Sequence, residues 1–63
     1  MENKDRYYAV LKEDNGKLNE IDLGERIGLT EYETMEIIAE LLAEYKIEYE
    51  RNRLCDYRVL KRK

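Results

Sequence analysis

The residues Thr30-Glu31-Tyr32-Glu33 constrain the fold of this chain most, because they match the capping box that begins an α-helix. In this motif the threonine hydroxyl and the carboxylate three residues later each accept a hydrogen bond from a backbone N–H that the helix leaves unpaired. Residues 31–45 contain no Gly or Pro and are rich in Glu, Ala, Leu, Met and Ile, which favour helices. The sequence therefore predicts a helix over residues 31–45.

Two shorter helices are expected before residue 30. In the segment 5–14, apolar residues recur at spacings of three and four, as on one face of a helix that ends at Asn15-Gly16. The segment 20–27 follows Asn19, a good N-cap residue, carries acidic residues in its first turn and stops at Gly28. The apolar face of the first helix consists of Tyr7, Tyr8, Val10 and Leu11.

The pattern changes to strict alternation after residue 45, which favours strands over a helix. Polar and apolar residues alternate in 46–50, and in 55–60 Cys55, Tyr57 and Val59 alternate with Asp56, Arg58 and Leu60 and share the inward face. Between the two runs, Asn52 tolerates the positive φ that a tight hairpin turn needs. We therefore expect a β-hairpin over residues 46–60 and an α+β fold, with three helices followed by a C-terminal hairpin in one domain, residues 1–63.

Composition narrows the range of functions. The chain has no His and one cysteine, Cys55, so a structural zinc site lacks its ligands and a nucleophile lacks an imidazole to activate it. We therefore expect no metal, no cofactor and no enzymatic activity. No apolar run approaches the roughly 20 residues that span a membrane, and no secretory signal follows Met1. A single cysteine agrees with a reducing compartment, so the expected location is the cytoplasm.

The segment Leu23-Gly24-Glu25-Arg26-Ile27-Gly28-Leu29-Thr30 and the residues after it resemble the winged helix-turn-helix family of bacterial and archaeal transcription regulators. Residues 27–30 resemble the turn, 31–45 the recognition helix and 46–60 the wing, so the resemblance covers about Lys4 to Leu60. It implies a small winged helix-turn-helix fold and DNA binding in transcription regulation. Two features depart from the family: Tyr45 stands where a glycine usually ends the recognition helix, and that helix has no Lys, Arg, Ser, Asn or Gln.

Charge is distributed unevenly along the chain. Residues 1–45 have 5 basic and 12 acidic side chains, a net charge of −7, whereas residues 46–63 have 7 basic and 3 acidic ones, a net charge of +4. A basic surface favours contact with DNA phosphates, although a solvated hairpin tip and a basic C-terminus explain the same residues equally well. The candidate DNA-binding residues are Arg51, Arg53 and Arg58 in the wing, Lys61, Arg62 and Lys63 at the C-terminus, and Tyr32 and Thr34 at the start of the third helix.

The third helix also supports an alternative, a protein-interaction module with no nucleic-acid role. It carries Glu31, Glu33, Glu36, Glu40 and Glu44. Four of these, from Glu33 onward, are expected in one row roughly opposite a core face made of Thr34, Ile38, Leu41 and Tyr45. The row is interpreted as an acidic solvent face or as a docking surface.

Apolar residues extend around this helix further than a small core requires. A flank beyond the core face consists of Tyr32, Ala39 and Ala43, with Met35 at its border, and either the first helix covers it or it mediates self-association. A domain of about 60 residues has a marginal core, and this one has neither a disulfide nor a metal to reinforce it. We therefore expect a homodimer formed through this flank, with another protein as a further possible partner.

Overall fold

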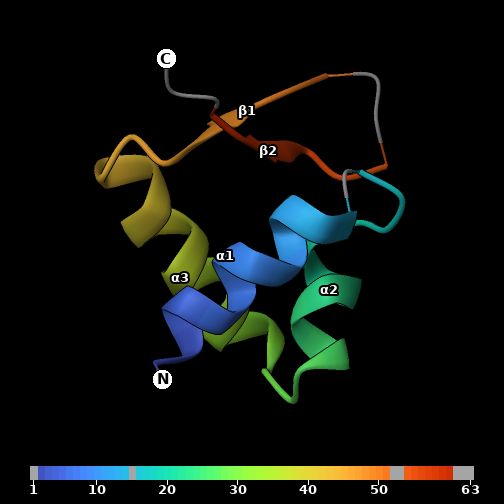
Figure 1. Ribbon diagram of the computed structural model, residues 1–63. Coiled ribbons are helices and arrows are strands. Elements are labelled where there is room, and N and C mark those ends of the chain that lie inside the picture. The colour runs from blue at the N-terminus through green and yellow to red at the C-terminus, as the bar shows by residue number, and fades with distance from the viewer. Residues whose placement is uncertain (1, 15, 52–53, 61–63) are drawn as a thin grey trace.

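The computed structural model describes residues 2–14, 16–51 and 54–60. They form a small α+β domain in which three helices precede a two-stranded antiparallel hairpin, a topology consistent with a winged helix. Figure 1 shows α1 lying across α2 and α3, with the hairpin over one end of the helices. The predicted order is therefore confirmed. The elements are α1 (Asn3–Asp14), α2 (Glu20–Arg26), α3 (Glu31–Ala43), β1 (Ile47–Tyr49) and β2 (Tyr57–Val59).

Helix α1 begins two residues earlier than the sequence indicated and ends at the expected position. Gly16 follows it with a φ of 85°, a left-handed conformation that glycine adopts without steric cost. Tyr7 and Leu11 are buried, and Tyr8 and Val10 pack partly buried against the core, so the predicted apolar face is confirmed.

Helix α2 and the turn after it follow the expected capping rules. The Asn19 side chain accepts a hydrogen bond from the backbone N–H of Asp22 at 2.8 Å. The helix ends at Arg26, one residue before the predicted end, and Gly28 has a φ of 84°. Leu29 N–H then donates to the carbonyl of Gly24, which pairs one of the carbonyl groups that a helix C-terminus leaves free.

The α3 N-terminus forms the predicted capping box, with the Thr30 hydroxyl and the Glu33 carboxylate each accepting from the other residue's N–H. The helix ends at Ala43, two residues early, because Tyr45 adopts a φ of 59°. Lys46 N–H donates to the Leu41 carbonyl and Tyr45 N–H to that of Leu42, so Tyr45 takes the position that a glycine usually fills. The prediction of Tyr45 as a core residue is wrong: the left-handed turn leaves its side chain 77% exposed.

The hairpin has the predicted strands but a longer connection. Ile47 pairs with Val59 and Tyr49 with Tyr57 in the antiparallel register, so residues 50–56 join the strands. The predicted tight turn at 51–53, with the expected role of Asn52, lies mostly outside the described residues, which include Arg51 but not residues 52 and 53. Cys55 is buried as expected, and its thiol donates to the Tyr57 carbonyl.

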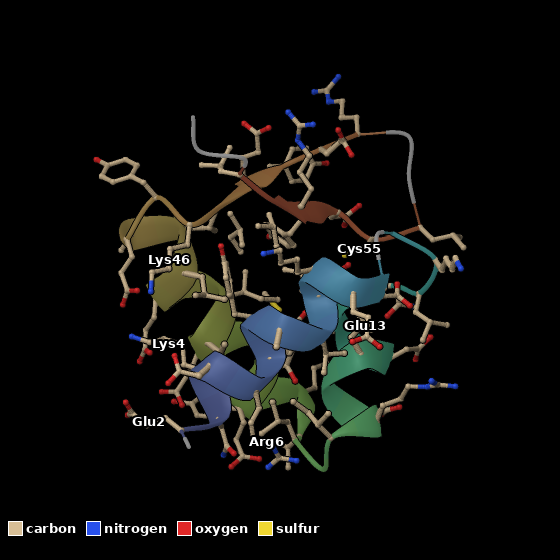
Figure 2. All side chains as sticks on the ribbon, in the orientation of Figure 1. Glu2, Lys4, Arg6, Glu13, Lys46 and Cys55 are labelled. Carbon is tan, nitrogen blue, oxygen red and sulfur yellow. The ribbon has the colours of Figure 1, made fainter. Side chains whose placement is uncertain are left out.

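Glu20 links the helices to the hairpin from the first turn of α2. Its carbonyl accepts a hydrogen bond from the Tyr7 hydroxyl of α1 at 2.8 Å. Its carboxylate accepts one from the Asp56 N–H, just before β2, at 3.1 Å. These bonds close the core between the helices and the hairpin, where Figure 2 shows Cys55. The core side chains are Tyr7, Leu11, Leu23, Leu29, Ile37, Ile38, Leu41, Ile47 and Cys55, with Thr34 as the buried polar residue.

A close helix–helix contact joins Gly24 in α2 to Thr34 in α3. A Cβ atom at Gly24 would lie 1.9 Å from the Thr34 Oγ1 and 3.0 Å from its Cβ, so no larger residue fits this crossing as it stands. The Thr34 hydroxyl donates to the Thr30 carbonyl at 2.9 Å, which satisfies it inside the core. This contact packs α2 against the inward face of α3.

Candidate functional site

Helix α3 has two apolar faces, of which only one is buried. The inner face consists of Thr34, Ile37, Ile38 and Leu41. On the other side lie Tyr32, Met35, Ala39 and Ala43, which we call the outer strip, and all four are exposed. Tyr32 and Leu41 are nine residues apart, which at about 100° per residue places them on opposite sides of the helix. The outer strip is therefore the solvent face of α3, with Tyr32 73% and Met35 44% exposed.

One of the two interpretations of the sequence placed α1 over the outer strip. The structure contradicts it, because all four residues of the strip are exposed. Instead, the N-terminal turn of α1 lies along the glutamates of α3, where Lys4 Nζ is 2.5 Å from Glu44 Oε2 and 3.9 Å from Glu40 Oε1. An open groove between the two helices is lined by Glu2, Asn3, Lys4, Glu33, Glu36, Ile37 and Glu40.

The glutamate row of α3 consequently borders the outer strip rather than lying opposite the core, which corrects the prediction. We call Glu33, Glu36, Glu40 and Glu44 the glutamate edge. With α2 packed against the core side of α3, the row falls beside α1 and the apolar strip falls opposite the core.

The C-terminal end of the glutamate edge is neutralised within the domain. The hydrogen bond from Lys4 lowers the pKa of Glu44, and the same bond raises the pKa of Lys4. Lys46 adds a second ion pair to Glu44 at 3.4 Å, and its ammonium lies 5.8 Å from the centre of the Tyr8 ring. Figure 2 shows Lys4 and Lys46 on the same side of the molecule. Glu36, in the middle of the edge, forms no ion pair with any residue that the structure describes.

Two of the predicted DNA-contacting residues are not available at the surface: Thr34 is buried, and Arg58 is paired within the domain. Thr34 is fully buried against Gly24, so its expected contact with DNA is wrong. Arg58 ion-pairs with Glu48, its partner across the hairpin, and its Nε is 3.4 Å from Glu50 Oε2.

Two of the remaining DNA candidates lie at the surface. Arg51 is exposed and pairs with no acidic group in the described part of the chain, and Tyr32 is exposed in the outer strip. Arg53, Lys61, Arg62 and Lys63 lie outside the described residues.

Cys55 is the side chain most suited to nucleophilic chemistry, and its surroundings oppose that role. Burial raises the pKa of its thiol, which disfavours the reactive thiolate. Within residues 2–14, 16–51 and 54–60, no three Cys, Asp or Glu side chains are grouped to hold a metal ion. None of the helices there is long and apolar enough to cross a membrane.

Sequence reasoning missed the role of Gly24, although a signal was present. A glycine inside a helix costs about 1 kcal/mol relative to alanine, so its presence often indicates a close packing contact. The partner of that contact, Thr34, is ten residues further along the chain, and the helical pattern gives no means of pairing them.

No protein-family model, no curated protein and no solved structure matches this chain. Three features of the domain itself bear on its function. The third helix has an exposed apolar strip with a glutamate edge beside it, and in the hairpin Arg58 is ion-paired while Arg51 is exposed.

Proposed function

We propose that this domain is a non-catalytic protein-interaction module that docks a partner on the outer strip of α3. The observation that carries the proposal is the exposure of Tyr32 and Met35 on the face opposite the core. Tyrosine and methionine are enriched in protein interfaces, because they bring a large contact area that becomes favourable when water is removed.

The charges around the strip support a protein partner over DNA. Helix α3 carries glutamates and no basic residue from Glu31 to Ala43, whereas a helix that enters the major groove meets phosphates on both sides. Lys4 and Lys46, the basic residues nearest to this helix in the ion-pair network, are both engaged by Glu44. Docking α3 into DNA would therefore add repulsion without a compensating cation.

Pull-down experiments with matched variants test the proposal. The immobilised domain is expected to retain a defined set of proteins from an extract of its source cells, and Ala39→Glu, which places a charge inside the outer strip, is expected to lose them. Glu13→Lys, at an exposed site on α1 outside the strip, serves as the matched control and should retain the set. Retention of the same proteins by Ala39→Glu would refute docking on this face.

A second copy of the chain is the occupant that the sequence predicts for this strip, because the core is small. Sedimentation equilibrium measures it directly. A homodimer gives twice the chain mass, melts at a temperature that rises with concentration, and becomes a monomer in Ala39→Glu. A chain that sediments as a monomer at near-millimolar concentration leaves the strip to a different protein.

DNA binding through the wing is the second candidate function. The helix-turn-helix arrangement of α2 and α3 favours it, as does Arg51, which is exposed and unpaired among the described residues. Titration of a labelled DNA duplex at low salt tests it, since non-specific DNA binders reach a Kd of about 10⁻⁴ to 10⁻⁶ M. Binding that Arg51→Ala weakens and Ala39→Glu leaves unchanged would favour DNA, with Arg53 and Lys61 to Lys63 as the next residues to replace.

A further inference from the structure

We infer that the partner on the outer strip is a basic amphipathic helix, with an apolar seam against α3 and Lys or Arg side chains facing the glutamate edge. This inference rests on the proposed protein-interaction function and specifies its partner. Three features support it: the shape of the strip, the glutamates beside it, and the repulsion between these glutamates and a negatively charged partner.

The shape of the strip suits a helix. Tyr32 and Met35 form a bulky N-terminal half, whereas Ala39 and Ala43 form a low C-terminal half one helical turn apart. A partner helix can approach closely over the two alanines and place its own large apolar side chains there, while Tyr32 and Met35 pack against its smaller residues. The four residues follow the spacing of three to four that helix-on-helix docking uses.

The charge beside the strip specifies the sign of the partner. Glu36 lies in the middle of the glutamate edge and has no ion pair with a described residue, and Glu40 is 3.9 Å from its nearest cation, Lys4 Nζ. Both carboxylates are available to a cation that approaches over the strip. Glu33 is engaged in the capping box and Glu44 with two lysines, so Glu36 and Glu40 are the two positions that a basic partner would contact.

The same charges disfavour a second copy of the chain. In an antiparallel two-fold pair of α3 helices, the equivalent edges lie on the same side of the interface. Setting Tyr32 of one copy against Ala43 of the other places Glu36 beside the other copy's Glu40, and like charges across an interface repel. Duplex DNA and anionic membranes meet the same repulsion, so a cationic protein segment is the occupant that fits.

Two synthetic peptides of about 20 residues test this inference. They share one Leu/Ala seam and differ only along the flanks, which carry Lys in one peptide and Glu in the other. Calorimetric titration of the whole chain at low ionic strength is expected to give at least about tenfold tighter binding of the Lys peptide, because two exposed ion pairs form and two repulsions are avoided. The difference should shrink as salt is added.

Variants separate the contribution of charge from that of the apolar strip. Glu36→Lys should remove most of the preference for the Lys peptide, and Tyr32→Ala should weaken binding of both peptides. Glu13→Lys makes the same change of charge on an exposed site of α1 and should leave the preference intact. Amide chemical shifts that move along residues 32–43 on binding would place the peptide on the strip.

The outcomes of these experiments test the basic partner helix separately from the proposed protein-interaction function. Equal binding of both peptides along the strip would overturn the basic partner and leave the protein-interaction function standing. Undiminished binding of the Lys peptide to Ala39→Glu would mean charge attraction alone and would overturn the inference, as would binding of neither peptide. The pull-down with Ala39→Glu then decides the proposed function separately, and a concentration-dependent mass that Ala39→Glu abolishes would assign the strip to a second copy.

Discussion

The two apolar faces of α3 have opposite environments. Ile38 and Leu41 on the inner face are each 1% exposed, whereas Met35 and Tyr32, only a few residues away on the outer strip, lie in solvent. The covered face carries the branched aliphatic side chains, and the close contact between Gly24 and Thr34 lets α2 pack against it. Helix α1 places Lys4 beside the glutamate edge and leaves the outer strip uncovered. The uncovered face is the one that the proposed function uses.

The largest expected effect is the loss of stability on truncating an inner-face side chain, compared with truncating one on the outer strip. Ile38→Ala should destabilise the domain by about 2 to 5 kcal/mol, because it removes buried methyl groups and leaves a cavity. Met35→Ala, on the outer strip, should change the free energy of unfolding by less than about 0.5 kcal/mol. Chemical denaturation measures both. Similar losses for the two variants would mean that the outer strip is covered in solution.

The next largest effect is expected at the contact between Gly24 and Thr34, where α2 packs against the inner face of α3. Gly24→Ala should cost about 3 kcal/mol, since the new Cβ overlaps the Thr34 hydroxyl and forces α2 and α3 apart. The double variant Gly24→Ala with Thr34→Ala should recover part of that loss. Gly28→Ala is the matched control: apart from its neighbours in the chain, no atom of the described residues lies within 4 Å of its new Cβ, so only the strain of its φ of 84° remains, about 1 to 2 kcal/mol. A Gly24 variant as stable as the wild type would contradict the close crossing.

A pH titration of Tyr7→Phe tests the contact of α1 with α2, through the hydrogen bond from the Tyr7 hydroxyl to the Glu20 carbonyl. The variant should lose about 1 kcal/mol at neutral pH, because the Glu20 carbonyl loses a donor. Burial raises the pKa of Tyr7 above its ordinary value of 10.0, so the stabilisation is complete below about pH 10 and is lost as the pH rises further.

The alkaline limb of this experiment has a distinct signature. The wild type should lose up to about 1.4 kcal/mol per pH unit above pH 10 from this group, and Tyr7→Phe should lack that component. The two stability curves should therefore converge near pH 11. Cys55 and Tyr57, whose pKa values burial also raises, titrate in both proteins and serve as the common background. Parallel curves would show that Tyr7 is not desolvated.

The smallest effect concerns the end of α3, where the inner face stops. Tyr45→Gly should stabilise the domain by about 1 kcal/mol, because glycine relieves the strain of a side chain at a φ of 59°. Tyr45→Ala removes the aromatic ring but keeps the strained backbone, so it should give no comparable gain in melting temperature. If both variants behave alike, the effect belongs to the ring and not to the backbone.

Local rules predicted much of the fold. The capping box at Thr30, the N-cap at Asn19 and the change to alternation after residue 45 located the helices and strands to within two residues. These signals act over three or four residues, so the sequence carries them in readable form. Tyr45 shows where that reading fails. Its position in the helical pattern indicated burial, but the carbonyl groups at the end of α3 are satisfied by a left-handed turn that removes it from the helix.

Capping signals and periodicity predicted three helices and a hairpin, the apolar excess on the third helix and its row of glutamates. They also predicted that Thr34, Ile38 and Leu41 face the core, but the tertiary structure was needed to show that α1 leaves the outer strip exposed, because that depends on contacts between separate helices. The tertiary structure also decided that Arg58 is held by Glu48 and that Lys4 reaches Glu44, forty residues away in the chain. Capping and periodicity are local and leave their mark on neighbouring residues. Packing and ion pairing join residues whose separation in the chain carries no trace of their contact in space.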